Sequence, residues 1–210
     1  WNPWTWNDDM KPDWSQAEAH LRTSGPILKE VIERTGPCGL SVQEGGFVTV
    51  VDSIIGQQLS NKVAKVLRAR FRTLFADGIP EPQQLLTFAD DALRGCGFSR
   101  AKTRYVRALA EAVASGKLDF DALHQADDET VVQTLTELPG IGRWTAEMYL
   151  IFALNRPDVL PLGDAAVAAA LCSLYPLPEK RWEPEARRIA EPWRPWRSVA
   201  SWYLWRHHAG

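Results

Sequence analysis

The sequence predicts an all-α protein made of two helical subdomains with a cleft between them and a helix-hairpin-helix motif. Three observations point to this fold class. Apolar residues recur at spacings of three and four along most of the 210 residues, which is the period of an amphipathic helix. No stretch of the sequence alternates as a half-buried strand does. Glycine, proline and capping residues divide the chain into segments of helical length.

The first half of the chain contains six expected helices. Residues 1–14 hold four tryptophans and are expected to form an irregular arm. Ser60 and Ser99 stand where a helix begins, and a serine hydroxyl there accepts a hydrogen bond from the first turn. Residues 78–82 are interpreted as a loop. The expected helices span residues 15–23, 26–36, 47–56, 60–74, 88–93 and 99–116.

The second half starts with a helix that Asp127 opens and that leads into residues 138–146. Another helix follows to about residue 153, and Asp164 is expected to cap an alanine-rich helix that ends near residue 175. Two more helices are expected over residues 185–190 and 196–207. We expect residues 1–46 and 155–210 to form one helical subdomain, and residues 47–154 to form a barrel-like second one.

The stretch at 138–146 joins two of these helices by a tight turn. Pro139 sets the entry of the turn, while Gly140 and Gly142 tolerate positive φ and leave the backbone bare of side chains. A bare backbone at a helix N-terminus presents several N–H donors to one point, which suits a phosphate. The pattern favours a grip on a nucleic-acid backbone. An ordinary proline-glycine turn between two packed helices is the alternative interpretation.

Charge and cysteine content restrict the class of protein. The net charge is −2, yet residues 61–110 carry ten basic and four acidic side chains, and a local basic face attracts phosphate. Cys38, Cys96 and Cys172 lie far apart in no metal-binding pattern, so we expect reduced thiols and no metal cluster. No membrane-spanning run or secretion signal is present. We therefore expect a cytoplasmic protein, associated with the nucleoid if bacterial, with no membrane partner.

Four stretches, in this order, resemble the 3-methyladenine DNA glycosylase II family of the helix-hairpin-helix DNA glycosylase superfamily. The likeness covers about residues 25–208. Well-known members of the family carry an additional β-rich N-terminal domain, whereas the residues before 47 here read as helical, so we expect a compact form. The four stretches are 47–64 with its Ile55-Gly56-Gln57-Gln58-Leu59-Ser60 segment, 93–102, the hairpin at 138–146 followed by Pro161-Leu162-Gly163-Asp164, and 193–198 with Trp205.

The resemblance implies base flipping followed by hydrolysis of the N-glycosidic bond, with Asp164 as the catalytic carboxylate. A carboxylate there stabilises the positive charge that develops on the sugar and orients the attacking water. Asp164 also stands where a plain helix cap would, and Asp158 in the preceding loop is the rival carboxylate. In relatives that also cut the backbone, the resemblance places a lysine at position 144, whose amine forms a Schiff base. Trp144 cannot do so, which favours a monofunctional enzyme.

The base pocket implied by the resemblance contains Trp144 and Trp205. Tryptophan stacks best on an electron-poor, cationic base, so we expect alkylated purines of the 3-methyladenine and 7-methylguanine type. Both tryptophans have a structural alternative, as buried anchors of their helices. Leu59 would be the wedge that fills the gap in the base stack, and its alternative is a core leucine.

The remaining site residues are expected to touch DNA or a cation. DNA contacts are expected from Gln58, Ser60, Gly140, Gly142, Arg143, Thr145, Ser99, Arg100 and Lys102, although a capped and solvated helix start also explains the last three. The resemblance further implies a structural Na⁺ or K⁺ on the backbone carbonyls of Thr136, Leu138 and Ile141. No other cofactor is expected.

The sequence is thus interpreted as a monomeric base-excision repair enzyme that acts on double-stranded DNA containing alkylated bases. Two alternatives remain open at this point. One is a glycosylase for a neutral base, oxidised or mismatched. The other is a non-catalytic module that binds damaged DNA, which has no need of the pairing between Asp164 and Trp144.

Overall fold

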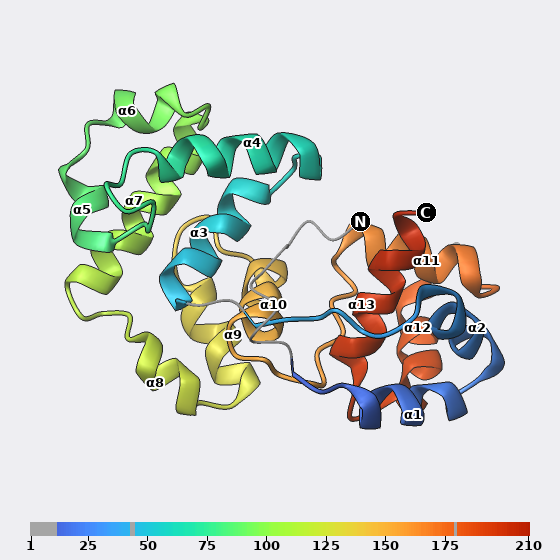
Figure 1. Ribbon diagram of the computed structural model, residues 1–210. Coiled ribbons are helices and arrows are strands. Elements are labelled where there is room, and N and C mark those ends of the chain that lie inside the picture. The colour runs from blue at the N-terminus through green and yellow to red at the C-terminus, as the bar shows by residue number, and fades with distance from the viewer. Residues whose placement is uncertain (1–11, 43–44, 179) are drawn as a thin grey trace. The chain divides into compact units, whose positions relative to one another are not determined.

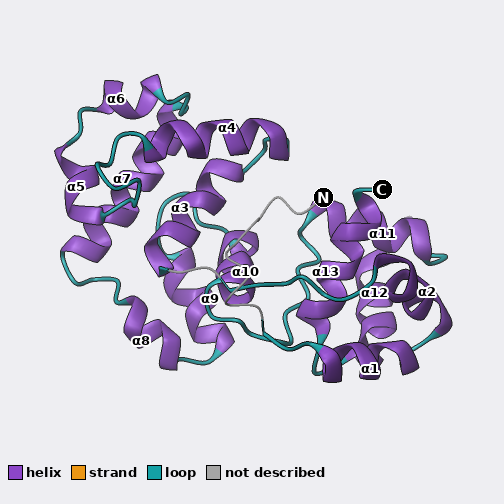
Figure 2. Cartoon of the chain, in the orientation of Figure 1, coloured by secondary structure: helices purple, strands orange, loops and turns teal. Residues whose placement is uncertain are grey.

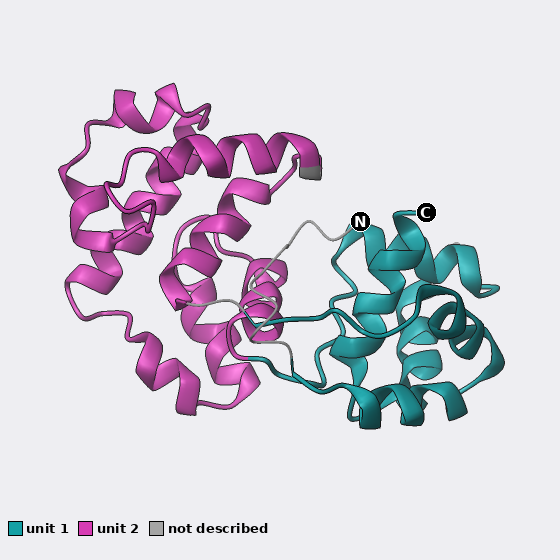
Figure 3. Cartoon of the chain, in the orientation of Figure 1, with its two compact units in different colours: residues 1–42, 155–210 teal, residues 43–154 magenta. Residues whose placement is uncertain are grey.

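All the secondary structure that the computed structural model assigns within residues 12–42, 45–178 and 180–210, the residues the structure describes, is helical (Figures 1 and 2). The predicted all-α class is therefore confirmed for this part of the chain. The chain divides into two compact units, residues 1–42 with 155–210 and residues 43–154 (Figure 3). The second division coincides with the boundary expected after residue 154, and the first falls a little before the one expected after residue 46.

The first unit is built around its C-terminal helix. Helix α13 packs against α11, α2 and α1, and Trp193, Tyr203, Leu21, Leu28 and Ile32 are among its fully buried side chains. The described elements of this unit are α1 (Ser15–Thr23), α2 (Pro26–Thr35), α11 (Ala165–Leu174), α12 (Trp182–Ala190), the 3-10 turn η2 (Glu191–Trp193) and α13 (Arg197–His208).

The second unit is built around α3 and α10, which pack against each other. Every residue from Phe47 to Ile55 except Val48 is buried, as is every residue from Thr145 to Phe152, so both helices are internal on nearly all sides. The elements of this unit are α3 (Gly46–Gly56), α4 (Asn61–Arg72), α5 (Pro82–Thr87), α6 (Asp90–Gly95), α7 (Arg100–Ala114), α8 (Phe120–Gln125), α9 (Asp128–Thr136) and α10 (Arg143–Phe152).

A buried carboxylate ties α3 to α4 inside the second unit. Arg72 donates to the Oδ2 atom of Asp52 at 2.7 Å, and Arg68 donates to the backbone carbonyl of Asp52 at 2.9 Å. Burial raises the pKa of the Asp52 carboxyl above its ordinary value, against the two arginines, which lower it. Arg68 and Arg72 therefore have a structural role, since both make their hydrogen bonds to Asp52 inside the second unit.

The structure corrects several expected helices. The helix expected over residues 88–93 is found as α6 and starts two residues later, because Phe88 and Ala89 are extended and separate α5 from α6. Pro82 belongs to the first turn of α5 rather than to a loop. Helix α8 is new, and α12 begins at Trp182 rather than at residue 185. Short helices carry too few turns for a periodic pattern to reveal them.

The expected arm lies mostly outside the described residues. Of its four tryptophans only Trp14 is described, and it is buried, with its indole N–H donating to the carbonyl of Leu40 at 2.7 Å. Among the described helices, none combines the length and the apolar character that crossing a membrane requires.

Candidate functional site

The hairpin is a tight turn between α9 and α10. The N–H of Leu138 donates to the carbonyl of Leu135 at 3.1 Å, and that of Ile141 donates to Leu138 at 3.2 Å. Asp127 caps α9, as expected, by accepting from the N–H of Thr130. Gly142 is the N-cap of α10, so the N–H groups of the first turn of α10 follow directly on the turn. This geometry presents positive backbone dipoles at one helix start.

The two hairpin glycines have different roles. Gly140 has φ +78°, and a Cβ atom there would lie 2.2 Å from the ring of Tyr105 on α7. Gly142 has φ −97°, which any residue adopts, and a Cβ atom there would meet nothing within 4 Å. Of the two glycines that tolerate positive φ, only Gly140 adopts it, because the turn has ended before Gly142. Gly142 contributes a bare approach to the helix start.

The three residues after the turn face different surroundings. Arg143 is 61% exposed and lies 3.4 Å from Glu129 and 3.2 Å from Glu147. Trp144 is half-buried, so it is not the fully buried anchor of the structural alternative. The side chain of Thr145 is 1% exposed, and its hydroxyl accepts a hydrogen bond from Gln57. The Thr145 hydroxyl is therefore directed to the interior of the second unit, and the expected DNA contact from this residue stays a prediction.

The loop between α3 and α4 carries the expected wedge. Leu59 is half-buried and is not part of the core. Gln58 is exposed and has φ +57°, a left-handed conformation for a residue with a side chain. Ser60 caps α4 by accepting from the N–H of Val63 at 3.5 Å. The turn thus presents Gln58, Leu59 and Ser60 at the surface of the second unit.

Gln57, which the sequence reasoning passed over, connects this loop to the hairpin. Its side-chain amide donates to the carbonyl of Gly140 at 2.9 Å and to the Oγ1 atom of Thr145 at 3.0 Å. The local pattern gives one signal only, that a second glutamine stands beside Gln58. The partner of its amide lies 83 positions away, beyond the reach of any local periodicity.

The start of α7 divides into two kinds of residue. Ser99 caps the helix by accepting from the N–H of Lys102, and Ser99 and Arg100 are exposed. The ammonium of Lys102 instead donates to the carbonyls of Ile55 and Gln57, the latter at 2.8 Å. Burial, with help from Arg68, lowers the pKa of Lys102 to about 8. The ammonium of Lys102 makes its hydrogen bonds inside the second unit, so Lys102 is poorly placed for the expected phosphate contact.

Asp164 caps α11 in the first unit. Its Oδ1 atom accepts from the N–H groups of Ala166 at 3.0 Å and Val167 at 2.9 Å, and from the indole N–H of Trp205 at 2.9 Å. Three donors on one oxygen fix the orientation of the carboxylate. Trp205 is half-buried rather than fully enclosed in the core. The structure brings Asp164 and Trp205 together although 41 positions separate them.

Asp158, the rival carboxylate, has a structural role. Asp158 lies 2.7 Å from both Arg194 and Arg197, and Arg197 also donates to its backbone carbonyl. These contacts fix the loop before α11 to the start of α13. A carboxylate neutralised by two guanidinium groups is poorly suited to stabilise a positive sugar, which leaves Asp164 as the catalytic candidate of the first unit.

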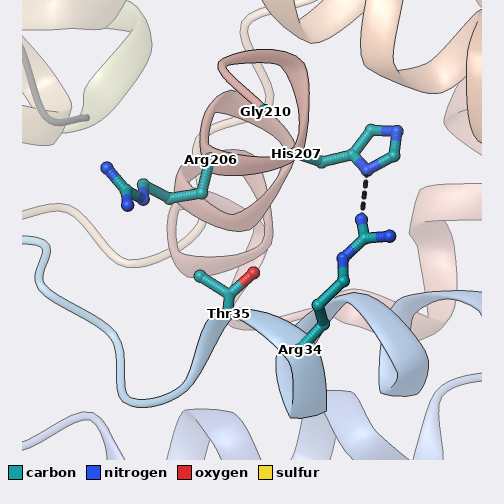
Figure 4. A pocket seen from close by; sticks show the side chains of 5 residues that line it. All are labelled: Arg34, Thr35, Arg206, His207 and Gly210. Atoms are coloured by element: carbon teal, nitrogen blue, oxygen red, sulfur yellow. Dashed lines mark hydrogen bonds between the residues drawn. The ribbon is translucent and has the colours of Figure 1, made fainter.

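A shallow pocket of about 200 Å³ lies at the end of α13 (Figure 4). Arg34 and His207 point toward each other there, 2.7 Å apart, as Figure 4 shows. Thr35, Arg206 and Gly210 complete the lining, which includes neither Asp164 nor Trp205. The three cysteines are free thiols, and the described residues contain no group of histidine, cysteine and carboxylate side chains suited to a metal.

The described secondary structure is helical, and a glycine hairpin stands at the start of α10. An aspartate cap that accepts a hydrogen bond from a tryptophan stands at the start of α11. These features together are typical of the helix-hairpin-helix class. Comparison with known proteins agrees. The HhH-GPD superfamily base excision DNA repair protein family matches residues 51–195. The chain therefore belongs to the HhH-GPD superfamily of base excision DNA repair proteins.

Individual relatives match over most of the chain. DNA-3-methyladenine glycosylase 1 of Schizosaccharomyces pombe is 30% identical, covering 91% of this chain and 86% of that protein. The structure of a 3-methyladenine DNA glycosylase of Schizosaccharomyces pombe in complex with abasic DNA matches with a TM-score of 0.85 and 30% identity, covering 91% and 96%. A DNA-3-methyladenine glycosidase of Bacillus halodurans matches with a TM-score of 0.79 and 36% identity, covering 92% and 89%.

Proposed function

We propose that this protein is a monofunctional DNA glycosylase that removes alkylated bases from double-stranded DNA. The observation that carries the proposal is the Asp164 cap, held by two backbone N–H groups and the indole of Trp205. The relatives named as 3-methyladenine glycosylases support the substrate class. We expect the protein to act as a monomer, in the cytoplasm beside the nucleoid if its source is bacterial.

The proposed chemistry needs no strong acid. The bond between C1′ of the sugar and the base nitrogen breaks, and its electron pair leaves with the base. An alkylated purine that starts with a positive charge departs neutral. Asp164 stabilises the positive sugar, a water oxygen adds to C1′, and the proton of that water passes to Asp164 and then to solvent. The product is an abasic site with an intact backbone.

Trp144 decides between the two classes of glycosylase in this proposal. It stands at the position where the resemblance places the lysine of the backbone-cutting relatives, and an indole forms no imine. Its half-buried ring offers a face on which a flipped cationic base stacks. Trp205 offers a second aromatic surface in the unit that carries Asp164.

DNA is held, in this proposal, by the hairpin and the loop at 57–60. The N–H groups at the start of α10 take a phosphate, with Arg143 and the exposed Ser99 and Arg100 adding polar contacts. Leu59 enters the gap that the flipped nucleotide leaves, beside Gln58 and Ser60.

A Na⁺ or K⁺ ion fits the hairpin chemically. Its ligands would be the carbonyls of Thr136, Leu138 and Ile141, and carbonyl oxygens are suitable ligands for hard cations. The Leu138 carbonyl accepts one hydrogen bond, from Ile141, and a carbonyl oxygen has a second lone pair. The ion would neutralise part of the phosphate charge.

The test is base release from duplex DNA that contains 7-methylguanine or 3-methyladenine, with the released base identified by chromatography. We expect the wild type to release these bases and leave strands intact until alkali is added. Asp164→Asn keeps the cap oxygen, and we expect its release rate to fall by a factor on the order of 10² or more.

The outcomes separate the alternatives. Release of an oxidised or mismatched base alone would identify a neutral-base glycosylase. Binding of damaged duplex with no base released would identify a recognition module. An unchanged rate in Asp164→Asn would contradict the role of that carboxylate, and strand cleavage by the enzyme itself would contradict the monofunctional assignment.

A further inference from the structure

The side chain of Gln57 connects the loop that carries Leu59 to the hairpin. The two N–H bonds of the Gln57 amide reach the Gly140 carbonyl at 2.9 Å and the Thr145 hydroxyl at 3.0 Å. One acceptor belongs to the turn and the other to the first turn of α10. Gln57 therefore joins the proposed wedge loop to the proposed phosphate grip within one unit.

A second side chain, that of Lys102, contacts the same loop. The ammonium of Lys102 donates to the carbonyls of Ile55 and Gln57, which are acceptors at the C-terminal end of α3. A cation there complements the negative end of the helix. The surroundings otherwise disfavour the charge, since burial and the neighbouring Arg68 lower the pKa of Lys102. Arg68 donates to the Asp52 carbonyl, whereas Lys102 donates to the carbonyls of Ile55 and Gln57 at the end of α3.

Helix α7 brings these contacts together. Lys102 and Tyr105 stand one turn apart on α7, and the Tyr105 ring lies against Gly140 so closely that no Cβ fits. One face of α7 thus contacts the loop through Lys102 and the hairpin through Tyr105. Loop, hairpin and α7 form one junction inside the second unit.

The loop needs such support because its own backbone disfavours its shape. Gln58 takes a left-handed conformation at φ +57°, which is unfavourable for a residue with a side chain. A wedge also meets the resistance of the base stack that it enters. A loop free to relax would lose the geometry that insertion requires.

We propose that Gln57 and Lys102 are positioning residues that hold the Leu59 loop rigidly on the hairpin, so that phosphate binding and wedge insertion act as one step. The inference rests on the proposed function, which supplies the roles of wedge and grip. It assigns Lys102 to the support of the loop and gives Gln57 a role that the family resemblance in the sequence did not include.

The test uses a duplex with a tetrahydrofuran abasic analogue next to 2-aminopurine. Insertion of Leu59 into the gap changes the stacking of 2-aminopurine and hence its fluorescence. Gln57→Glu keeps the size of the side chain but sets a carboxylate oxygen against the Gly140 carbonyl. We expect Gln57→Glu and Lys102→Met to need about tenfold more protein for the same change. Their affinity for undamaged duplex, measured by anisotropy, should change by less than about twofold.

Controls make the result specific. Leu59→Ala should abolish the fluorescence change, which identifies the signal as the wedge. Gln83→Ala and Lys117→Met remove the same side-chain types from exposed positions of the unit, and both should behave as wild type. Thermal unfolding of each variant checks that the fold is intact.

The analogue carries no base to release, so the signal is independent of catalysis. Wild-type fluorescence change without base release from methylated DNA would contradict the proposed function and leave the positioning of the wedge supported. Wild-type titration curves in folded Gln57→Glu and Lys102→Met would overturn the positioning inference while base release stands. Equal losses of wedge insertion and of undamaged-duplex binding would also overturn it, because they would show a general DNA contact.

Discussion

At the scale of single residues, the same carboxylate is both a structural cap and the catalytic candidate. Asp164 accepts from two N–H groups of α11, as any aspartate N-cap does. The third donor, the Trp205 indole, is what distinguishes it from a plain cap. Asp158 shows the contrast, since its two arginines direct it to the fold. The partners of a carboxylate therefore decide between roles that its type and position leave open.

Lys102 gives a pH-dependent prediction for stability. Its pKa is about 8 in the folded protein, against an ordinary value of 10.5. Between these two values the unfolded chain holds the proton and the folded protein does not, so the free energy of unfolding rises with pH through this group. Chemical denaturation at pH 8 and pH 10 should show the wild type gaining stability relative to Lys102→Met. A constant difference between the two proteins at both pH values would contradict the lowered pKa.

At the scale of elements, the hairpin depends on one of its glycines for shape and on the other for access. Gly140 is required twice, by its positive φ and by the Tyr105 ring against it. Gly142 has neither constraint and serves as the N-cap of α10. Glycine is thus required at Gly140 for its backbone conformation and close packing, whereas at Gly142 it leaves the start of α10 uncovered by a side chain.

A matched pair of substitutions separates these needs. Gly140→Ala should lower the free energy of unfolding by about 2 kcal/mol or more, because left-handed strain adds to displacement of the Tyr105 ring. Gly142→Ala should cost less than about 1 kcal/mol, the difference between these two residues at an N-cap. Urea denaturation of both variants measures the two costs. An equal loss in the free energy of unfolding for the two variants would show that the Tyr105 ring moves away from position 140 without loss of stability.

At the scale of the whole molecule, the basic residues divide into two groups that the sequence does not distinguish. Arg68, Arg72, Lys102 and Arg107 are all directed to acceptors within the second unit. Others remain exposed, among them Lys62 and Lys65 in the first turns of α4, just after the Leu59 loop. The electrostatic surface available to DNA is therefore smaller than the residue count indicates.

The salt dependence of DNA binding tests this division. We expect log Kd for undamaged duplex to depend linearly on log salt concentration, and each lysine that touches a phosphate to contribute about 1 to the slope. The double variant Lys62→Gln, Lys65→Gln should therefore lower the slope by about 2. Lys117→Gln, at an exposed position in the turn after α7, should leave it unchanged. The same slope in all three proteins would show that α4 lies away from the backbone of DNA.

Local features of the sequence suffice to predict the helical class, the hairpin, and the caps at Ser60, Ser99, Asp127 and Asp164. These features depend on residues within about four positions of one another, and local periodicity and capping chemistry act over that distance. The family followed from the same source, because its motifs are contiguous stretches. The short helices α5 and α8 were missed since one or two turns do not make a period. Phe120 of α8 is held by contacts with the distant Gly46 and Tyr149.

The hydrogen-bond partners of the polar side chains depend on the tertiary structure. The partners of Gln57, Lys102 and Trp205 lie about 40 to 90 positions away along the chain, and nothing in a local pattern specifies such pairs. Burial then sets the role: Thr145 and Lys102 turn inward, while Arg100 and Gln58 remain at the surface. The physical reason is that a buried polar group must find a partner inside the fold, and packing alone determines which groups are buried.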